Sequence, residues 1–129
     1  MRLLMTILLL ITAASLSACG GDSQAASSPT QTEENQKAEV TAGQSLFMSN
    51  CSACHGPTGT GVKGLGKPLV NSPFVDSQSD EALLAFLNTG RPRNDPLNTT
   101  NLAMPPKGGN PDLTDSQLQA IIAYIRSIQ

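Results

Sequence analysis

The chain has 129 residues and a formal net charge of −2, which excludes the strongly basic surface typical of nucleic-acid-binding proteins. It contains no Trp, one Tyr and three Phe, so a core built only from its own aromatic side chains would be small. A single small domain of this length is marginally stable, and a bulky apolar cofactor would supply the missing core volume.

The first eighteen residues have the pattern of an export signal. Arg2 is followed by the apolar segment 3–11 and then by small residues that lead to Cys19. The apolar run is shorter than the roughly 20 residues that a transmembrane helix needs. "LSAC" resembles the lipobox of bacterial lipoproteins, which implies cleavage before Cys19 and lipidation of its thiol. The alternative is an ordinary secretory signal in which Cys19 has no role.

The lipoprotein interpretation predicts an extracytoplasmic protein anchored to a bacterial membrane, on the periplasmic side in a Gram-negative cell. Gly20 differs from the Asp that resembles an inner-membrane retention signal, so the outer membrane is favoured where one exists. Residues 20–39 contain no apolar side chain larger than Ala, and such a segment cannot bury enough surface to offset its ordering entropy. We therefore predict a flexible tether over 19–39 and a folded domain over 40–129.

Three main helices are predicted in this domain. "TAGQ" has the pattern of a capping box and predicts a helix from Thr41 to about Asn50. A second helix is predicted between the cap residue Ser79 and the terminating Gly90. A second capping box at Thr114 starts the third helix. Its apolar side chains recur with helical spacing at Leu118, Ile121, Ile122, Ile125 and Ile128.

No segment shows the alternation of a β-strand, so the predicted fold class is all-α. The long loops 56–77 and 91–111 together make up nearly half of the domain. Irregular chain of that length in a compact protein needs a central group to organise it. A haem would serve this purpose.

The motif "CSACH" places Cys51, Cys54 and His55 within five residues. A zinc site needs four ligands, and the domain has no other Cys or His, so Asp would have to complete it. A thioredoxin-like redox pair is expected beside a βαβ pattern, which is absent. C-x-x-C-H is the attachment motif of c-type haem, in which both thiols bond covalently to the haem and the imidazole binds its iron.

Over residues 40–129 the chain resembles the monohaem class I c-type cytochromes, which implies the cytochrome c fold around one covalent haem. Besides "CSACH", the resemblance rests on "AMPP" near the end, on Gly43 and Phe47 before the haem motif, and on Tyr124 in the last helix. From composition alone, Gly43 is equally compatible with a close helix contact and with a bland surface position. The family also implies that the carbonyl of Pro68 accepts a hydrogen bond from His55.

Met104 is the candidate for the second axial ligand. Met48 lies one turn before Cys51 and cannot plausibly reach the opposite haem face, whereas Met104 lies in a proline-stiffened loop. A packing role for Met104 is the alternative. With His55 and Met104 both on the iron, no position stays open for a substrate, so the prediction is a one-electron carrier and not an enzyme.

We expect a monomer that serves a respiratory or photosynthetic chain, with redox proteins, and among them a membrane respiratory complex, as partners. The alternatives are a haem subunit of a larger oxidoreductase or dehydrogenase and, with Met104 off the iron, a haem sensor or peroxidase. Arg91 and Arg93 are candidates for pairing with the haem propionates, or else solvated loop residues. Five of the six basic residues after Val40 lie in the loops, and we expect them to steer docking to an acidic partner.

Overall fold

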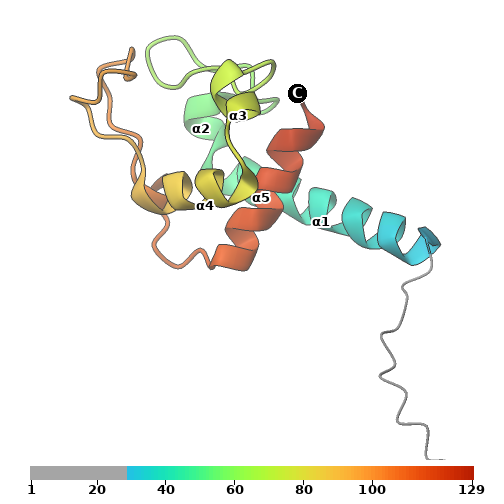
Figure 1. The fold of residues 1–129 in the computed structure, drawn as a ribbon. Helices are drawn as coiled ribbons and strands as arrows, with labels where there is room; N and C mark the ends of the chain where they lie inside the picture. Colours follow the sequence, from blue (N-terminus) through green and yellow to red (C-terminus); the bar gives the residue numbers. More distant parts are fainter. Residues whose placement is uncertain (1–28) are drawn as a thin grey trace, which may run out of the picture.

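The computed structural model describes residues 29–129, and the predicted signal and Cys19 lie outside them. Its helices, in chain order, are α1 (Pro29–Asn50), α2 (Ser52–His55), α3 (Pro73–Ser77), α4 (Asp80–Thr89), the 3-10 helix η1 (Pro106–Gly109) and α5 (Asp115–Ser127) (Figure 1). Within residues 29–129, extended pairing is limited to two isolated bridges, Val62 with Gly66 and Arg91 with Met104. The all-α prediction is confirmed.

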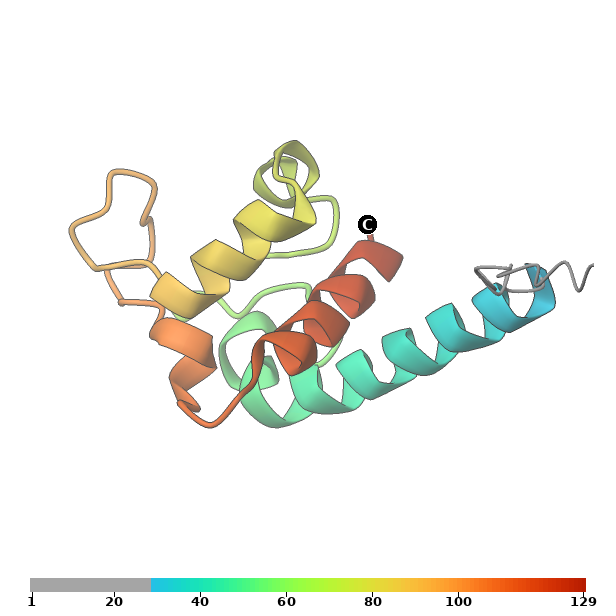
Figure 2. The same ribbon diagram turned by 60° about the horizontal axis from the view of Figure 1, so that its bottom comes forward.

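The domain is organised by the crossing of α1 and α5 (Figure 2). Gly43 lies on the backbone of Ala120, where a Cβ would come within 2.5 Å of the carbonyl carbon. One turn later Phe47, which is fully buried, packs against Tyr124 with ring centroids 5.2 Å apart. Gly43 therefore marks a close helix contact, and the surface alternative is wrong.

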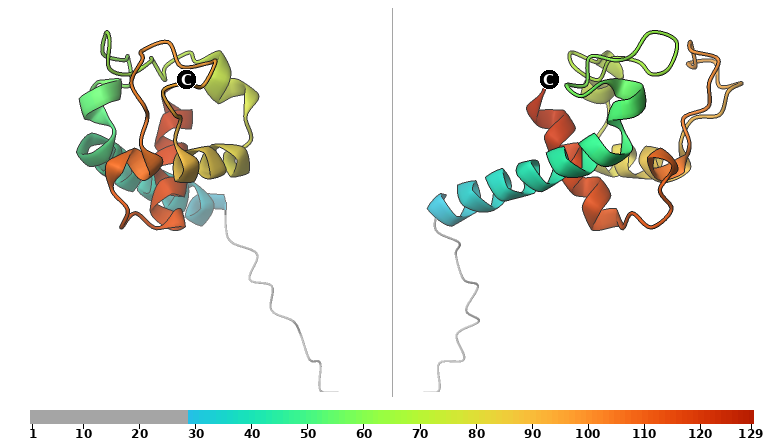
Figure 3. Two further views of the ribbon diagram at one scale, coloured as in Figure 1. Left: turned by 90° about the vertical axis from the view of Figure 1, so that its left-hand side faces the viewer. Right: turned by 180° about the vertical axis from the view of Figure 1, so that it is seen from behind.

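Helix α1 begins at Pro29, well before the predicted start at Thr41. Thr41 lies inside the helix, where its hydroxyl donates to the Lys37 carbonyl at 2.9 Å. Residues 29–39 are exposed, as their polarity predicted, but they are helical and not disordered. Residues 30–39 contain neither Gly nor Pro, and the well-packed half of α1 provides the nucleus on which this polar segment continues (Figure 3).

The caps of the other two long helices agree with prediction. The Ser79 hydroxyl accepts from the Ala82 amide at the start of α4, and Gly90 ends it at φ 72°. At α5, the reciprocal bonds of the capping box between Thr114 and Gln117 are both present.

The short helix α3 was not predicted. Arg126 fixes its position from α5, because its guanidinium donates to the carbonyls of Val75, at 2.7 Å, and Gln78.

No helix within 29–129 is long and apolar enough to cross a bilayer.

Candidate functional site

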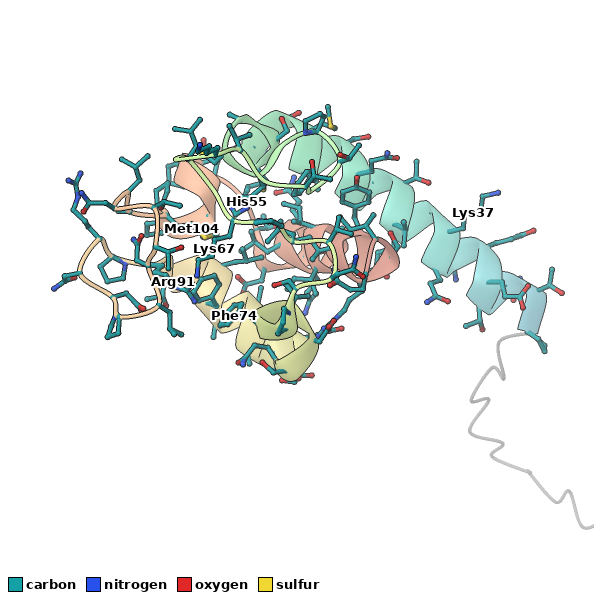
Figure 4. The ribbon with its side chains drawn as sticks, turned by 90° about the horizontal axis from the view of Figure 1, so that it is seen from above. Lys37, His55, Lys67, Phe74, Arg91 and Met104 are labelled. Atoms are coloured by element: carbon teal, nitrogen blue, oxygen red, sulfur yellow. The ribbon has the colours of Figure 1, made fainter. Side chains whose placement is uncertain are left out.

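A cavity of about 260 Å³ lies between the helices and the two long loops. Cys51, Cys54 and His55 line it from the region of α2, and Arg91 and Met104 line it from the segment after α4. Figure 4 shows His55, Met104 and Arg91 gathered in one region of the molecule, far from Lys37 on α1. The structure thus brings together residues that are up to 53 positions apart in the sequence.

The two cysteines are free thiols at the end of α1 and in α2. The amide of His55 donates to the Cys51 carbonyl at 3.0 Å, so the motif is wound into a single tight turn. Burial and, to a smaller extent, the neighbouring Cys54 thiol raise the pKa of the Cys51 thiol to about 11. Cys51 is therefore a neutral thiol at neutral pH, and it lacks the lowered pKa of a redox-active thiol.

His55 is oriented by a backbone carbonyl. Its Nδ1 lies 2.8 Å from the carbonyl oxygen of Lys67, which can only accept, so Nδ1 carries the proton and the lone pair of Nε2 is free for a metal. The predicted acceptor, Pro68, is wrong by one residue. The Gly61 amide bonds the His55 carbonyl and the Leu69 amide bonds the Gly59 carbonyl, and this register brings the Lys67 carbonyl to the ring.

Met104 is held by an antiparallel bridge to Arg91, with N–H to O=C distances of 2.8 and 2.9 Å. Gly90 packs directly against the Met104 carbonyl and the nitrogen of Pro106. Met104 is half-buried in the cavity wall, whereas Met48 is 45% exposed and does not line the cavity. The bridge, Gly90 and the prolines together fix the backbone that presents the Met104 thioether.

The residues of this cavity fit a covalently bound haem. Two thiols one helical turn apart, an imidazole with a free Nε2 and a thioether face one mainly apolar space. Imidazole and thioether are ligands that haem iron accepts, and the apolar wall suits a flat hydrophobic ring. The chain has few aromatic side chains to fill its core, and this cavity provides space for a cofactor that would fill it instead.

Comparison with known proteins agrees with this fit. Residues 40–129 match the family model described as Cytochrome c. The chain belongs to the cytochrome c family. As a class I c-type cytochrome it has haem c as its covalent cofactor, and electron transfer is the general function of its family.

The cytochrome is also similar to the cbb3-type cytochrome c oxidase subunit CcoP of Rhodobacter capsulatus. The two are 28% identical over 91 residues, which cover 70% of this chain and 29% of the subunit. The same subunit from a named strain of this bacterium is 27% identical over 93 residues, covering 71% of this chain and 30% of the subunit. The chain thus spans less than a third of the length of these relatives. No solved structure matches it significantly.

Of the two arginines that were predicted to pair with the haem propionates, Arg91 lines the cavity of this cytochrome. Its guanidinium lies 4.7 Å from the ring centroid of Phe74 and 4.9 Å from that of Phe86. The Arg91 Nε is buried and has no hydrogen-bond partner, since the nearest Asp95 oxygen is 3.9 Å away. Arg93 is exposed and does not line the cavity.

The two phenylalanines were not predicted as site residues. They come from α3 and α4, and only the packing of α3, a helix that the sequence analysis missed, brings Phe74 to within 5.0 Å of Phe86. The sequence held one indication of a role for Phe74, which is that this aromatic residue lies in the long loop 56–77.

Replacing Arg91 by Gln should lower the midpoint potential of the cytochrome by tens of millivolts, on the order of the energy of one partly buried charge pair. The reason is that a nearby positive charge favours the reduced iron, which carries one positive charge fewer. Potentiometric titration measures this, with Arg93→Gln as the control for loss of an exposed charge. Equal potentials in the wild type and Arg91→Gln would remove Arg91 from the propionate site.

Three of the five loop bases are engaged within the domain. Besides Arg91, the Lys67 ammonium donates to the Leu97 carbonyl and the Lys107 ammonium to the Leu113 carbonyl, both at 2.7 Å. Lys63 and Arg93 are exposed, and within residues 29–129 neither forms a hydrogen bond or an ion pair through its side chain. Lys67, Lys107 and Arg91 thus also tie the loops together, while Lys63 and Arg93 have no such role in the described residues.

Proposed function

We propose that this protein is a one-electron carrier whose haem iron is ligated by His55 and Met104. The observation that supports this most is that one cavity is lined by both cysteines, by His55 and by Met104. When bound, the haem supplies a one-electron redox couple. With His55 and Met104 both bound to the haem iron, the protein itself would supply the ligands, and no coordination site would be left for a substrate.

The residues of the site have different roles in this function. Cys51 and Cys54 hold the haem by thioether bonds, and the Lys67 carbonyl keeps the His55 ring turned so that Nε2 faces the iron. The Arg91–Met104 bridge presents the thioether, which raises the reduction potential relative to two histidine ligands. Arg91 gives its unpartnered Nε–H to a propionate.

An apolar rim at the cavity mouth is the surface through which we propose that electrons pass. Leu65, Leu97 and Leu102 line the cavity and are nevertheless 44%, 58% and 39% exposed. Exposed apolar patches of this kind mark interaction sites in soluble proteins. Lys63 and Arg93 are exposed in the loops that carry this rim, so we propose a partner with an apolar patch and carboxylates around it.

Replacing Met104 by Ala should abolish the far-red absorption band that sulfur-ligated ferric haem shows and should lower the midpoint potential strongly. The physical reason is the loss of the thioether, after which water or an added ligand takes the open position. Absorption spectroscopy and potentiometry measure both effects, and a pyridine haemochrome spectrum verifies that the haem is still covalently bound. Met48→Ala is the matched control, since Met48 does not line the cavity. Persistence of the band in Met104→Ala would reject Met104 as ligand, whereas absence of the band already in the wild type would favour a haem sensor or peroxidase.

The partner is proposed to be a membrane respiratory complex. Support comes from the similarity to a subunit named as part of a cbb3-type cytochrome c oxidase. The second candidate, a haem subunit built permanently into such an oxidase, rests on the same name. Isolation from membranes in mild detergent separates the two, because a subunit stays with the complex at high salt and a free carrier does not.

We also propose that lipidated Cys19 anchors the protein on the extracytoplasmic side of a membrane. The support is the signal-like segment 3–11 and "LSAC" in the sequence. The helical part of 29–39 then acts as a short rigid spacer between the anchor and the domain. The intact mass of the mature protein is the measurement, since an unmodified amino terminus before or at Cys19 would refute the anchor.

A further inference from the structure

The loop 91–104, which carries Met104, is closed at its base and ordered from within. The Arg91–Met104 bridge closes the base. The Asn98 side chain organises the interior, since its amide donates to the carbonyls of Pro92 and Leu102 at 3.1 and 2.7 Å. Asn98 also accepts from the Thr100 amide at 3.1 Å. The loop is therefore an internally ordered unit with a closed base.

A single side chain fastens this unit to the rest of the domain. The Lys67 ammonium donates to the Leu97 carbonyl at 2.7 Å. Within residues 29–129 this is the one hydrogen bond between segment 92–103 and any other segment. In the right-hand view of Figure 3 the loop lies at the edge of the domain.

The same residue also holds the imidazole on the other side of the cavity. The carbonyl of Lys67 accepts from His55 Nδ1 at 2.8 Å, while its ammonium reaches the loop of Met104. Figure 4 shows Lys67 in the same region of the molecule as the labelled His55, Met104 and Arg91. The backbone and side chain of one residue thus join the segments that carry the two proposed axial ligands.

We propose that Lys67 is a strap that keeps loop 91–104 closed over the cavity and so keeps Met104 on the iron. Lys67 is a positioning residue, since its ammonium acts through the Leu97 carbonyl and not on the iron. When this bond opens, the hydrogen bonds that remain between the loop and the rest of residues 29–129 are those at its base, and both water and small ligands gain access to the position of Met104. This proposal rests on the proposed function, in which Met104 ligates the iron.

The test is the binding of imidazole to the ferric, haem-loaded full-length protein, followed by the loss of the far-red band. Lys67→Met removes the ammonium and keeps an apolar stem of similar length. We expect it to bind imidazole about three- to tenfold more tightly than the wild type, because a hydrogen bond that opposes loop opening is lost. Lys67→Arg retains a donor and should recover most of the wild-type affinity.

Lys63→Met is the matched control, because Lys63 has the same charge and lies in the same loop but does not line the cavity. An equal change in imidazole affinity in Lys63→Met and Lys67→Met would overturn the strap and assign the effect to charge. Absence of the far-red band in the wild type would instead contradict the proposed function itself.

Should Lys67→Met not assemble with haem, amide hydrogen exchange of the haem-loaded Lys67→Gln protein provides the second measurement. Exchange in segment 92–103 should be faster than in the wild type, and exchange in α5 should be unchanged. Unchanged exchange in 92–103 would likewise overturn the proposal.

Discussion

Replacing Gly43 by Ala should destabilise the folded cytochrome by about 3 kcal/mol or more, although Ala is the better helix former. At an exposed position inside a helix the same change would stabilise by about 1 kcal/mol. Here the added methyl group would overlap the carbonyl of Ala120 and lie 3.1 Å from the Cβ of Tyr124. Because backbone atoms of α5 cannot move aside individually, α1 and α5 must separate.

Thermal or denaturant unfolding of the haem-loaded protein measures this effect. Ala42→Gly is the control, since Ala42 is the exposed neighbour of Gly43 on the same helix. This variant should lose only the stability of about 1 kcal/mol that comes from the lower helix propensity of Gly. Separation of α1 and α5 would also disturb Phe47 and Tyr124, so we expect lower yields of haem-loaded protein. An unchanged or raised stability of Gly43→Ala would show that the helices do not cross at this point.

Replacing Gly90 by Ala should displace Met104 while leaving the haem attached. Gly90 has φ +72°, and a Cβ there would overlap the Met104 carbonyl oxygen and lie 2.8 Å from the nitrogen of Pro106. With ψ −164°, Gly90 has a backbone conformation essentially restricted to glycine, which costs another residue about 1–3 kcal/mol, and the overlap adds to this. We therefore expect loss of the far-red band, a strongly lowered midpoint potential and an unchanged pyridine haemochrome spectrum.

Gly64→Ala is the control that separates strain from overlap. Gly64 has φ +79°, close to that of Gly90, but a Cβ there would meet nothing within 4 Å. Gly64→Ala should therefore lose stability to strain at positive φ, without overlap, and keep its far-red band. A normal band in Gly90→Ala would mean that the backbone at residue 90 does not set the position of Met104.

Local patterns predicted the parts of this fold that depend on neighbouring residues. The caps at Ser79 and Thr114 and the apolar stripe of the last helix act over one or two turns, so the sequence alone indicates them. The start of α1 was predicted too late, because the capping pattern at Thr41 occurs inside a helix that already continues from Pro29. A polar composition indicated exposure of 29–39 correctly, but exposure does not determine backbone conformation.

Contacts between distant segments decided the details of the site. The acceptor for His55 is the Lys67 carbonyl and not that of Pro68, because the register of loop 56–70 depends on bonds such as that of Leu69 to Gly59. Arg91 and Arg93 are equivalent in sequence, and only the packing of Phe74 and Phe86 distinguishes the cavity residue from the exposed one. Likewise, the sequence does not distinguish Lys63 from Lys67, and in the structure only the Lys67 ammonium donates to the Leu97 carbonyl.

The sequence by itself determined the chemistry of this protein: two thiols and an imidazole at the spacing of a haem attachment site, one methionine in a stiffened loop, and three helices. The tertiary structure decided which carbonyl orients the imidazole, which arginine reaches the cavity and which lysine joins its two loops. The physical reason is range. Motif spacing and helix capping involve residues a few positions apart, whereas hydrogen-bond partners across a cavity depend on the path that the loops take between them.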